Sequence, residues 1–439
     1  MLRKTKFEYM NNLKRILTAA ICCVVSIGVY SQEADSLLTV EKCVSMALSN
    51  NRKALTAKNE VESAINLKKE AFTKYFPEIS AAGIAFWANH DILQYNLLDI
   101  IELGIIKNGK VAGVQALQPI FTGGLIVNAN KLAAVGEEVA KIRSEQTDNE
   151  LRLNTETFFW KLNTLESSLT VLESAISFLD SLENQVKVAV DAGLVTRNDL
   201  LKVQLKRNGY MAERVDLENG IQLVKMLLGQ YIGVGTSGNI EIRAEVPSEL
   251  PPYPAELYTP AERALPLTSD YRLLQKNVEA KKLEKRMEIG SNLPSVALGA
   301  GWYYHDLLDQ NHNFGAIELG VNIPLTGWWS GAYSIKRRDL AIKSAQNELE
   351  DFSEQLQIEM QDKWNNLTAA HRKMEIEKLG ISQSEENLYL NKMYYEAGMS
   401  TITDLMDAET GRKEAGDRYV AAYGTFCTAR AAYLIATGR

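Results

Sequence analysis

The stretches "AGLVTRNDLLKVQ" (Ala192–Gln204) and "AGMSTITDLMDAE" (Ala397–Glu409) repeat one pattern 205 positions apart. Ala, Gly, Thr, Asp and Leu occupy the same places in both, and conservative exchanges fill several others. A glycine directly after an alanine suits the left-handed residue that ends a helix. Each stretch therefore predicts the turn between two helices, and its recurrence predicts an internal duplication of the chain.

The side chains after each glycine predict where the returning helix starts. Thr196 or Asn198 in the first stretch, and Ser400 or Thr401 in the second, can accept a hydrogen bond from a free amide at a helix N-terminus. An aspartate follows within the first turn, where its negative charge meets the positive end of the helix dipole. Both stretches are thus predicted to be tips of helical hairpins.

The positions of proline predict that the helices around these tips are long. None of the ten prolines lies between residues 120 and 246 or after residue 324, and proline is excluded from helix interiors. A helix over 123–186 would be about 95 Å long. A second long helix is predicted over 328–394, with return helices ending at 230 and spanning 402–436. Apolar residues of the first tract recur with coiled-coil spacing at Phe158, Leu162, Leu165, Leu169, Leu172, Ile176 and Leu179.

Segments with a different period precede each long helix. Residues 295–305 and 314–324 alternate apolar with small or polar side chains, which predicts strands. Residues 78–89 and 110–119 show the same alternation more faintly. About nine to eleven residues is the length of a strand that crosses a membrane. This order predicts a first repeat over 32–230, a linker over 231–259 and a second repeat over 260–439, with tips at 192–199 and 395–401.

The N-terminus has the order of a secretory signal peptide. Basic residues precede an apolar run over 16–30, and residues 29–31 form a plausible cleavage site, so residues 1–31 are predicted to be removed. The apolar run is short for a membrane-spanning helix. Cys22 and Cys23 lack the small preceding residue that lipidation requires, so a lipid anchor is not expected.

Removal of this segment makes the mature chain more acidic. Residues 1–31 hold five Lys or Arg and one Glu, so their loss lowers the formal net charge from −7 to −11. An acidic exported protein is a poor candidate for binding nucleic acid. Cys43 and Cys427 remain after cleavage, and export would permit a disulfide, so their pairing stays open.

Four strands are too few to close a membrane barrel by themselves. An open sheet edge in lipid leaves backbone polar groups without partners, at a cost of several kcal/mol each. The smallest membrane barrels have eight strands. Other copies of the chain would therefore complete the sheet: two copies supply eight strands and three supply twelve. The long helices would then extend the barrel as a tube.

In these features the chain resembles the TolC-like outer-membrane efflux proteins, also called outer-membrane factors. "QPIFTGG" (Gln118–Gly124) and "YYEAGMSTITDLMDAE" (Tyr394–Glu409) are similar to sequences of that family, and the resemblance covers nearly all of the mature chain. It implies a mixed α+β membrane protein. A long antiparallel α-helical barrel would be continuous with a transmembrane β-barrel, with four strands per chain, closed by trimerisation.

The resemblance also implies a function. The homotrimer would lie in the outer membrane of a Gram-negative-type bacterium and extend into the periplasm. There it would meet a periplasmic adaptor (a membrane fusion protein) and an inner-membrane transporter of an efflux or type I secretion system. The channel itself would be passive, without catalysis, cofactor or resident metal. Drugs, metal ions and proteins are all possible substrates.

Particular tip residues acquire roles through the same resemblance. Asp404 and Asp407 match aspartates that ring the periplasmic constriction, and their spacing puts both on one helix face. Tyr395 matches a gate tyrosine and Asp199 its partner, whereas the usual gate arginine falls on Ser400. Contacts with the adaptor are implied at Gly193, Leu194, Thr196, Gly398, Met399 and Thr401.

Aromatic residues near the strand ends predict contacts with the two membrane interfaces: Trp87, Trp302, Tyr304, Trp328 and Trp329. The histidines show no ligand spacing, and three of the four are expected in loops at strand ends: His90, His305 and His312, with His371 elsewhere. No phosphate-binding loop or catalytic motif is present. A periplasmic coiled-coil adaptor or structural protein, and an exported enzyme, are the alternatives. An adaptor or structural protein would not need the two strand pairs. An enzyme would need polar side chains that converge on one site, and the sequence shows no such motif.

Overall fold

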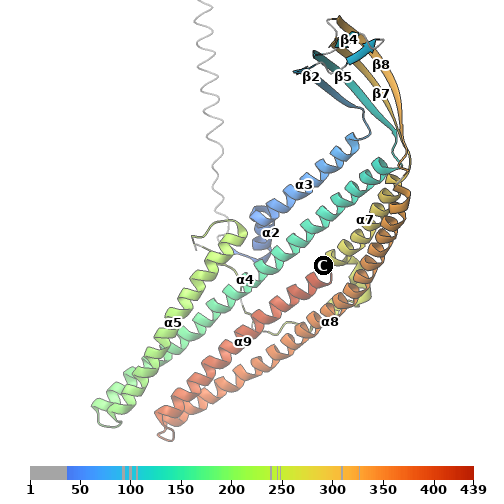
Figure 1. Ribbon diagram of the computed structural model, residues 1–439. Coiled ribbons are helices and arrows are strands. Elements are labelled where there is room, and N and C mark those ends of the chain that lie inside the picture. Colours follow the sequence, from blue (N-terminus) through green and yellow to red (C-terminus); the bar gives the residue numbers. More distant parts are fainter. Residues whose placement is uncertain are drawn as a thin grey trace, which may run out of the picture.

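The computed structural model describes residues 37–90, 94–97, 101–104, 107–237, 240–244, 246–247, 249–307, 310–325 and 327–439. The predicted signal peptide lies outside this part. The described chain is mostly helical, with a β-sheet at one end of the long helices and two helix-to-helix turns at the other (Figure 1). The C-terminus lies partway along the helices.

Four strands form the large sheet, in the order β2 (Glu78–Trp87), β5 (Asn108–Phe121), β7 (Ser295–Leu307) and β8 (Gln310–Asn322). All neighbouring strands are antiparallel. Because β5 and β7 are far apart in sequence, the sheet joins the two halves of the chain. Among the described residues, β2 and β8 each have one partner strand and therefore one open edge.

The register sorts the side chains of this sheet onto two different faces, because alternate residues of a strand point to opposite sides. One row across the four strands consists of Ile79, Ala116, Ala300 and Ile317. This face is apolar and open to solvent, since Ile79 and Ile317 are 70% and 82% exposed. The opposite face is more polar and includes Ser80, Gln115, Gly301 and Glu318.

Two short strand pairs lie outside the large sheet. β3 (Gln94–Leu97) and β4 (Ile101–Gly104) form an antiparallel hairpin within the connection from β2 to β5. β1 (Leu37–Leu38) pairs in parallel with β6 (Glu241–Ile242). The prediction of four strands is therefore incomplete, because strands of two to four residues are too short for alternation to be recognised.

The longest helices are α4 (Leu125–Asp191), with 67 residues, and α8 (Gly327–Glu396), with 70. Each is about 100 Å long at 1.5 Å per residue. α4 begins two residues later and ends five residues later than the sequence pattern predicted. No helix in the described part has both the length and the apolarity to cross a membrane. The other long helices are α2 (Val40–Asn50), α3 (Arg52–Thr73), α5 (Arg197–Ile232), α7 (Ser269–Ser291) and α9 (Ile402–Ala436).

The helices lie side by side in a layer one helix thick (Figure 1). α4 packs against α3 and α7 near the sheet, and against α5 and α9 toward the tips. α8 packs against α7 and α9, so it forms one lateral edge, and α3 and α5 form the other. These edge helices leave large apolar side chains at least 57% exposed, among them Leu67, Leu205, Ile358 and Ile376.

Two glycines form the junction between the helices and the sheet. Gly123, before α4, has a φ of +63°, which favours glycine. A Cβ at Gly123 would lie 2.9 Å from the carbonyl carbon of Gly290 near the end of α7. The two backbones therefore approach at a distance that leaves no room for a side chain.

The segment between the two halves is held by side chains from α8 and α9. The Tyr419 hydroxyl donates a hydrogen bond to the carbonyl of Pro247 at 3.1 Å. Nε2 of His371, a buried residue of α8, lies 2.8 Å from the carbonyl oxygen of Pro251. Three short helices continue this segment, η1 (Pro254–Leu257), α6 (Ala261–Ala264) and η2 (Leu265–Leu267).

The two cysteines of the described chain are both free. Cys43 is buried between α2, α4 and α5, and its burial raises the pKa of the thiol to about 11. Cys427 lies on α9, where burial raises the pKa of its thiol to about 12. The sequence left open whether the two cysteines pair; in the structure they are separate thiols and form no disulfide.

Candidate functional site at the helical tips

Both tips use the same backbone arrangement. Gly193 and Gly398 adopt φ values of +72° and +71°, which end α4 and α8 in the left-handed conformation. The amide of Leu194 donates to the carbonyl of Ala189 at 2.9 Å, and the matching bond at the second tip is 2.7 Å long. These bonds satisfy carbonyl groups that the last turn of a helix would otherwise leave unpaired.

Threonine caps both returning helices, each in a reciprocal capping box. Oγ1 of Thr401 accepts from the amide of Asp404 at 3.2 Å, and the Asp404 carboxylate accepts from the amide of Thr401 at 2.9 Å. At the first tip, the corresponding bonds of Thr196 are both 3.3 Å long. Thus threonine, rather than Asn198 or Ser400, is the cap at each tip.

The two aspartates assigned to a constriction have different environments. The carboxylate of Asp404 also accepts from the Thr401 hydroxyl at 2.6 Å and the Ser400 hydroxyl at 3.3 Å. These hydrogen bonds, first of all those from Thr401, hold the pKa of Asp404 below its ordinary value. Asp407 is exposed, and its carboxylate makes no hydrogen bond or ion pair within the described chain. The carboxylate of Asp404 is therefore held by hydrogen bonds within the tip, whereas that of Asp407 faces solvent.

Tyr395 and Asp199 come from different hairpins and lie near each other. Tyr395 packs against the apolar cluster that α4, α5 and α9 share at the tips. Its burial, followed by the negative charge of Asp199, raises the pKa of the Tyr395 hydroxyl. In the described chain no hydrogen bond joins the two side chains.

Lys202 is a link between the hairpins that the sequence did not indicate. Its Nζ lies 3.4 Å from Oδ1 of Asp199 and 3.4 Å from Oγ1 of Thr403, on α9. Lys202 occupies the place in the first stretch that Asp407 occupies in the second. The sequence shows this exchange of a basic for an acidic residue between the two stretches. Only the packing of the hairpins shows that Lys202 contacts the other hairpin.

The outermost side chains of the tips are apolar. Leu194 is 78% exposed and Met399 is 76% exposed. Each directly follows the left-handed glycine of its tip, so the turn itself presents the side chain to solvent.

Most of the aromatic residues assigned to membrane interfaces are exposed. Trp87, Trp302 and Trp329 are 76%, 63% and 80% exposed, and Tyr304 is partly buried. The side chain of Trp328 lies outside the described residues. Following the register from Trp302 across β5 to β2, Trp87 lies six residues farther from the helices. Trp87 and Trp302 are therefore not side by side in the sheet.

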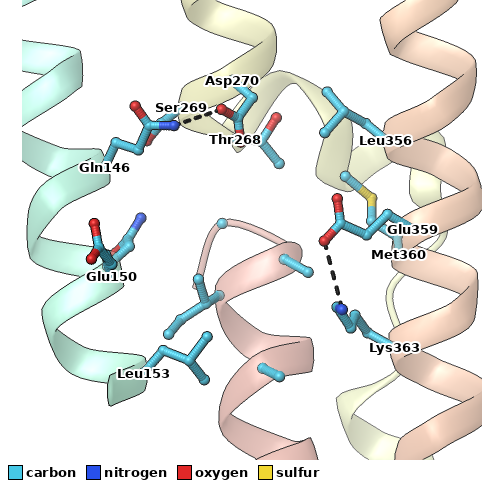
Figure 2. Close-up of a pocket in the computed structure, with 15 residues that line it drawn as sticks. Gln146, Glu150, Leu153, Thr268, Ser269, Asp270, Leu356, Glu359, Met360 and Lys363 are labelled. Carbon is cyan, nitrogen blue, oxygen red and sulfur yellow. Dashed lines mark hydrogen bonds and ion pairs between the residues drawn. The ribbon is translucent and has the colours of Figure 1, made fainter. Parts of the chain in front are cut away.

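A cavity of about 330 Å³ lies where α9 ends beneath the start of α7, between α4 and α8 (Figure 2). Nε2 of Gln146 donates to Oδ1 of Asp270 at 2.8 Å, and Nζ of Lys363 lies 3.8 Å from Oε1 of Glu359. These polar groups pair with each other and do not converge on a common point. No group of three or more His, Cys, Asp or Glu side chains in the described part could hold a metal. The cavity is therefore a packing gap between helix ends.

Comparisons with known proteins agree with this architecture. No protein-family model matches the chain. The outer membrane protein TolC of Escherichia coli (strain K12) is 21% identical over 426 residues, covering 91% of this chain and 81% of that protein.

Solved structures show the same fold. The outer membrane protein VceC of Vibrio cholerae has a TM-score of 0.76 at 16% identity, covering 91% of this chain and 96% of that one. The CmeC outer membrane channel of Campylobacter jejuni has a TM-score of 0.78 at 12% identity, covering 91% and 85%. The open state of the MtrE outer membrane channel of Neisseria gonorrhoeae has a TM-score of 0.73 at 14% identity, covering 91% and 88%.

The chain has the fold of the outer-membrane channels, with a sheet at one end of a layer of long helices and two capped tips at the other. It is similar to TolC over 91% of its length, and the resemblance that the sequence indicated is confirmed.

Proposed function

We propose that the chain is one subunit of a homotrimeric outer-membrane channel. The channel passively exports substrates that an inner-membrane transporter delivers through a periplasmic adaptor. The names of the relatives support the outer-membrane location and the channel, since they are described as outer membrane proteins and outer membrane channels. The transporter and adaptor supply energy and substrate choice, and this chain supplies the conduit.

The observation that carries this proposal is the presence of two open lateral edges. β2 and β8 each have an unpaired edge among the described strands, and the helical layer below them ends at α3 and α5 on one side and at α8 on the other. An open edge with exposed apolar side chains is unfavourable in water and worse in lipid. Joining the β2 edge of one copy to the β8 edge of the next would remove both defects along the whole length of the chain.

Three copies would then give a barrel of twelve strands continuous with a tube of helices. The apolar face that includes Ile79 and Ile317 would meet lipid, and the face with Gln115 and Glu318 would line the channel, as in other membrane barrels. An internal duplication explains why both halves contribute two strands, a long helix, a capped tip and a return helix.

We assign the periplasmic gate to the tips. Three copies of Asp407 and Asp404 would place six carboxylates around a narrow pore, which attracts cations. Asp407 is the stronger candidate for ion contact, because the hydrogen bonds of Asp404 are used within the tip. Tyr395 and Asp199 would lie at the contact between the two hairpins of the closed gate.

The remaining tip residues are assigned to the adaptor. Leu194 and Met399 provide exposed apolar contacts. Gly193 and Gly398 set the direction of the turns, and Thr196 and Thr401 fix the helix starts next to them.

Native mass spectrometry on protein extracted with detergent from outer membranes tests the assembly. Three chains per particle, with ion conductance after reconstitution into a planar bilayer, are expected. A monomer or dimer that is recovered without detergent would overturn the channel and favour the alternative of a periplasmic coiled-coil protein.

A further inference from the structure

Two histidines face each other across the hairpin of β7 and β8. His305 on β7 and His312 on β8 are direct register partners. Their ring centroids lie 5.3 Å apart, and the ring planes are inclined by 18°. The sequence analysis expected both residues in loops at strand ends, and that expectation is wrong, because both lie within strands. The strands continue to Leu307 and Gln310, and this register brings residues seven positions apart into contact.

The pair lies on the more polar face of the sheet, but the side chains next to it are apolar. His305 and Gly301 share this face, and the neighbour of His305 on β5 is Val111. The ring of Phe314 lies 6.2 Å from that of His305, in an edge arrangement. His312 is exposed, so the pair is open to solvent on one side.

One imidazole nitrogen in this pair has no hydrogen-bond partner. Nδ1 of His305 is buried, and no group in the described chain donates to it or accepts from it. Buried polar atoms in folded proteins are almost always paired, so an unpaired one calls for a missing partner. Val111 and the ring of Phe314 beside it are apolar, whereas the imidazole of its register partner His312 could share such a partner with it.

We propose that His305 and His312 chelate a divalent transition-metal ion of the Cu²⁺, Ni²⁺ or Zn²⁺ class. Imidazole nitrogen is a preferred ligand of these ions. With metal–nitrogen bonds of about 2.0–2.1 Å and a tetrahedral angle, the centroids of two bound rings are about 5 Å apart. The separation of 5.3 Å fits this value. In the metal-bound state the rings would turn about χ2 from their stacked arrangement until one nitrogen of each points at the shared ion.

The site would be shallow and exchangeable. No third His, Cys, Asp or Glu joins the pair in the described chain, so water would fill the other coordination positions. In the proposed trimer, three such pairs would lie on the channel face at the end of the barrel away from the helices. The pair itself belongs to one chain, so the metal site does not depend on the channel being formed.

Titration of Cu²⁺ into untagged, full-length protein in detergent tests the site. Calorimetry should show one ion per chain, and electron paramagnetic resonance should show two nitrogen ligands. His305→Gln and His312→Gln should each weaken binding by about tenfold or more, because a chelate draws its affinity from holding both ligands at once. His90→Gln is the matched control: His90 is an exposed histidine just beyond β2, and its loss should leave binding unchanged.

Three results would overturn the proposal. The first is unchanged affinity in both His305→Gln and His312→Gln. The second is a loss of half the bound copper in each variant at unchanged affinity, which would indicate two independent histidines. The third is a loss in His90→Gln equal to that in the pair variants. Circular dichroism and native mass spectra of each variant, compared with the parent protein, show whether a loss of binding follows from misfolding.

Discussion

Substitution of one glycine at the junction of sheet and helices should destabilise the protein more than substitution of its neighbour. Gly123 and Gly124 have φ values of +63° and +84°, so alanine at either position costs about 1–2 kcal/mol for the left-handed conformation. The two positions differ in the room that they leave for a Cβ atom. A Cβ at Gly123 would clash first with the carbonyl oxygen of Gly290 and would lie 2.9 Å from its carbonyl carbon, whereas at Gly124 the nearest atom is Nδ2 of Asn128 at 3.4 Å.

Backbone atoms cannot rotate away as a side chain can, so Gly123→Ala must displace α7 from α4. Overpacking of this kind costs about 1–3 kcal/mol. Gly123→Ala should therefore lower the free energy of unfolding by about 2–5 kcal/mol, and Gly124→Ala by about 1–2 kcal/mol.

Urea unfolding of the detergent-solubilised variants, followed by circular dichroism, measures the difference. Because both variants share the same detergent and nearly the same sequence, the difference between them isolates the contact with Gly290. Equal destabilisation by the two substitutions, or a larger loss in Gly124→Ala, would refute the close packing of α7 against the start of α4.

Three further predictions concern the tips and the helical layer. Asp407→Asn should reduce cation selectivity in single-channel recordings, and Glu354→Gln, an exposed acid in mid-helix, should not; equal effects would remove Asp407 from the constriction. The pKa of Asp404 is lowered in the folded state, so its contribution is complete above the unfolded value of about 3.9 and is lost as pH falls through the lowered pKa. Hydrogen-exchange protection of the second tip, corrected for intrinsic rates, should therefore be steady from neutral pH down to about 4 and fall at more acidic pH; constant protection to pH 2 would contradict this. Burial disfavours the charge of Lys413, but hydrogen bonds to Glu213 and to a second carboxylate raise its pKa overall. A double-mutant cycle of Lys413→Met and Glu213→Gln should thus show a coupling of about 0.5–3 kcal/mol in unfolding experiments, and a coupling near zero would show that the ion pair does not join α5 to α9.

The helices and their tips could be predicted from sequence because their causes are local. Exclusion of proline, coiled-coil spacing of apolar residues and a glycine after each long helix act within a few residues of the chain. Threonine and aspartate three positions apart form a capping box wherever the helix starts at that threonine. The stronger alternation of the second strand pair was likewise visible in the sequence, whereas β3 and β4 were too short to show a period.

Contacts between distant segments were decided by the tertiary structure alone. The register of β7 with β8 made partners of His305 and His312, and the packing of the hairpins placed Lys202 against Thr403. Periodicity predicts which face of a strand a side chain occupies, but not which residue lies opposite it. A shift of a strand by two residues keeps every side chain on its face and changes every partner. The sequence by itself therefore determined the long capped helices and the alternating strands. The packing of the two halves alone decided that strands and helices form one layer with open edges. It also decided which residues from distant segments contact each other.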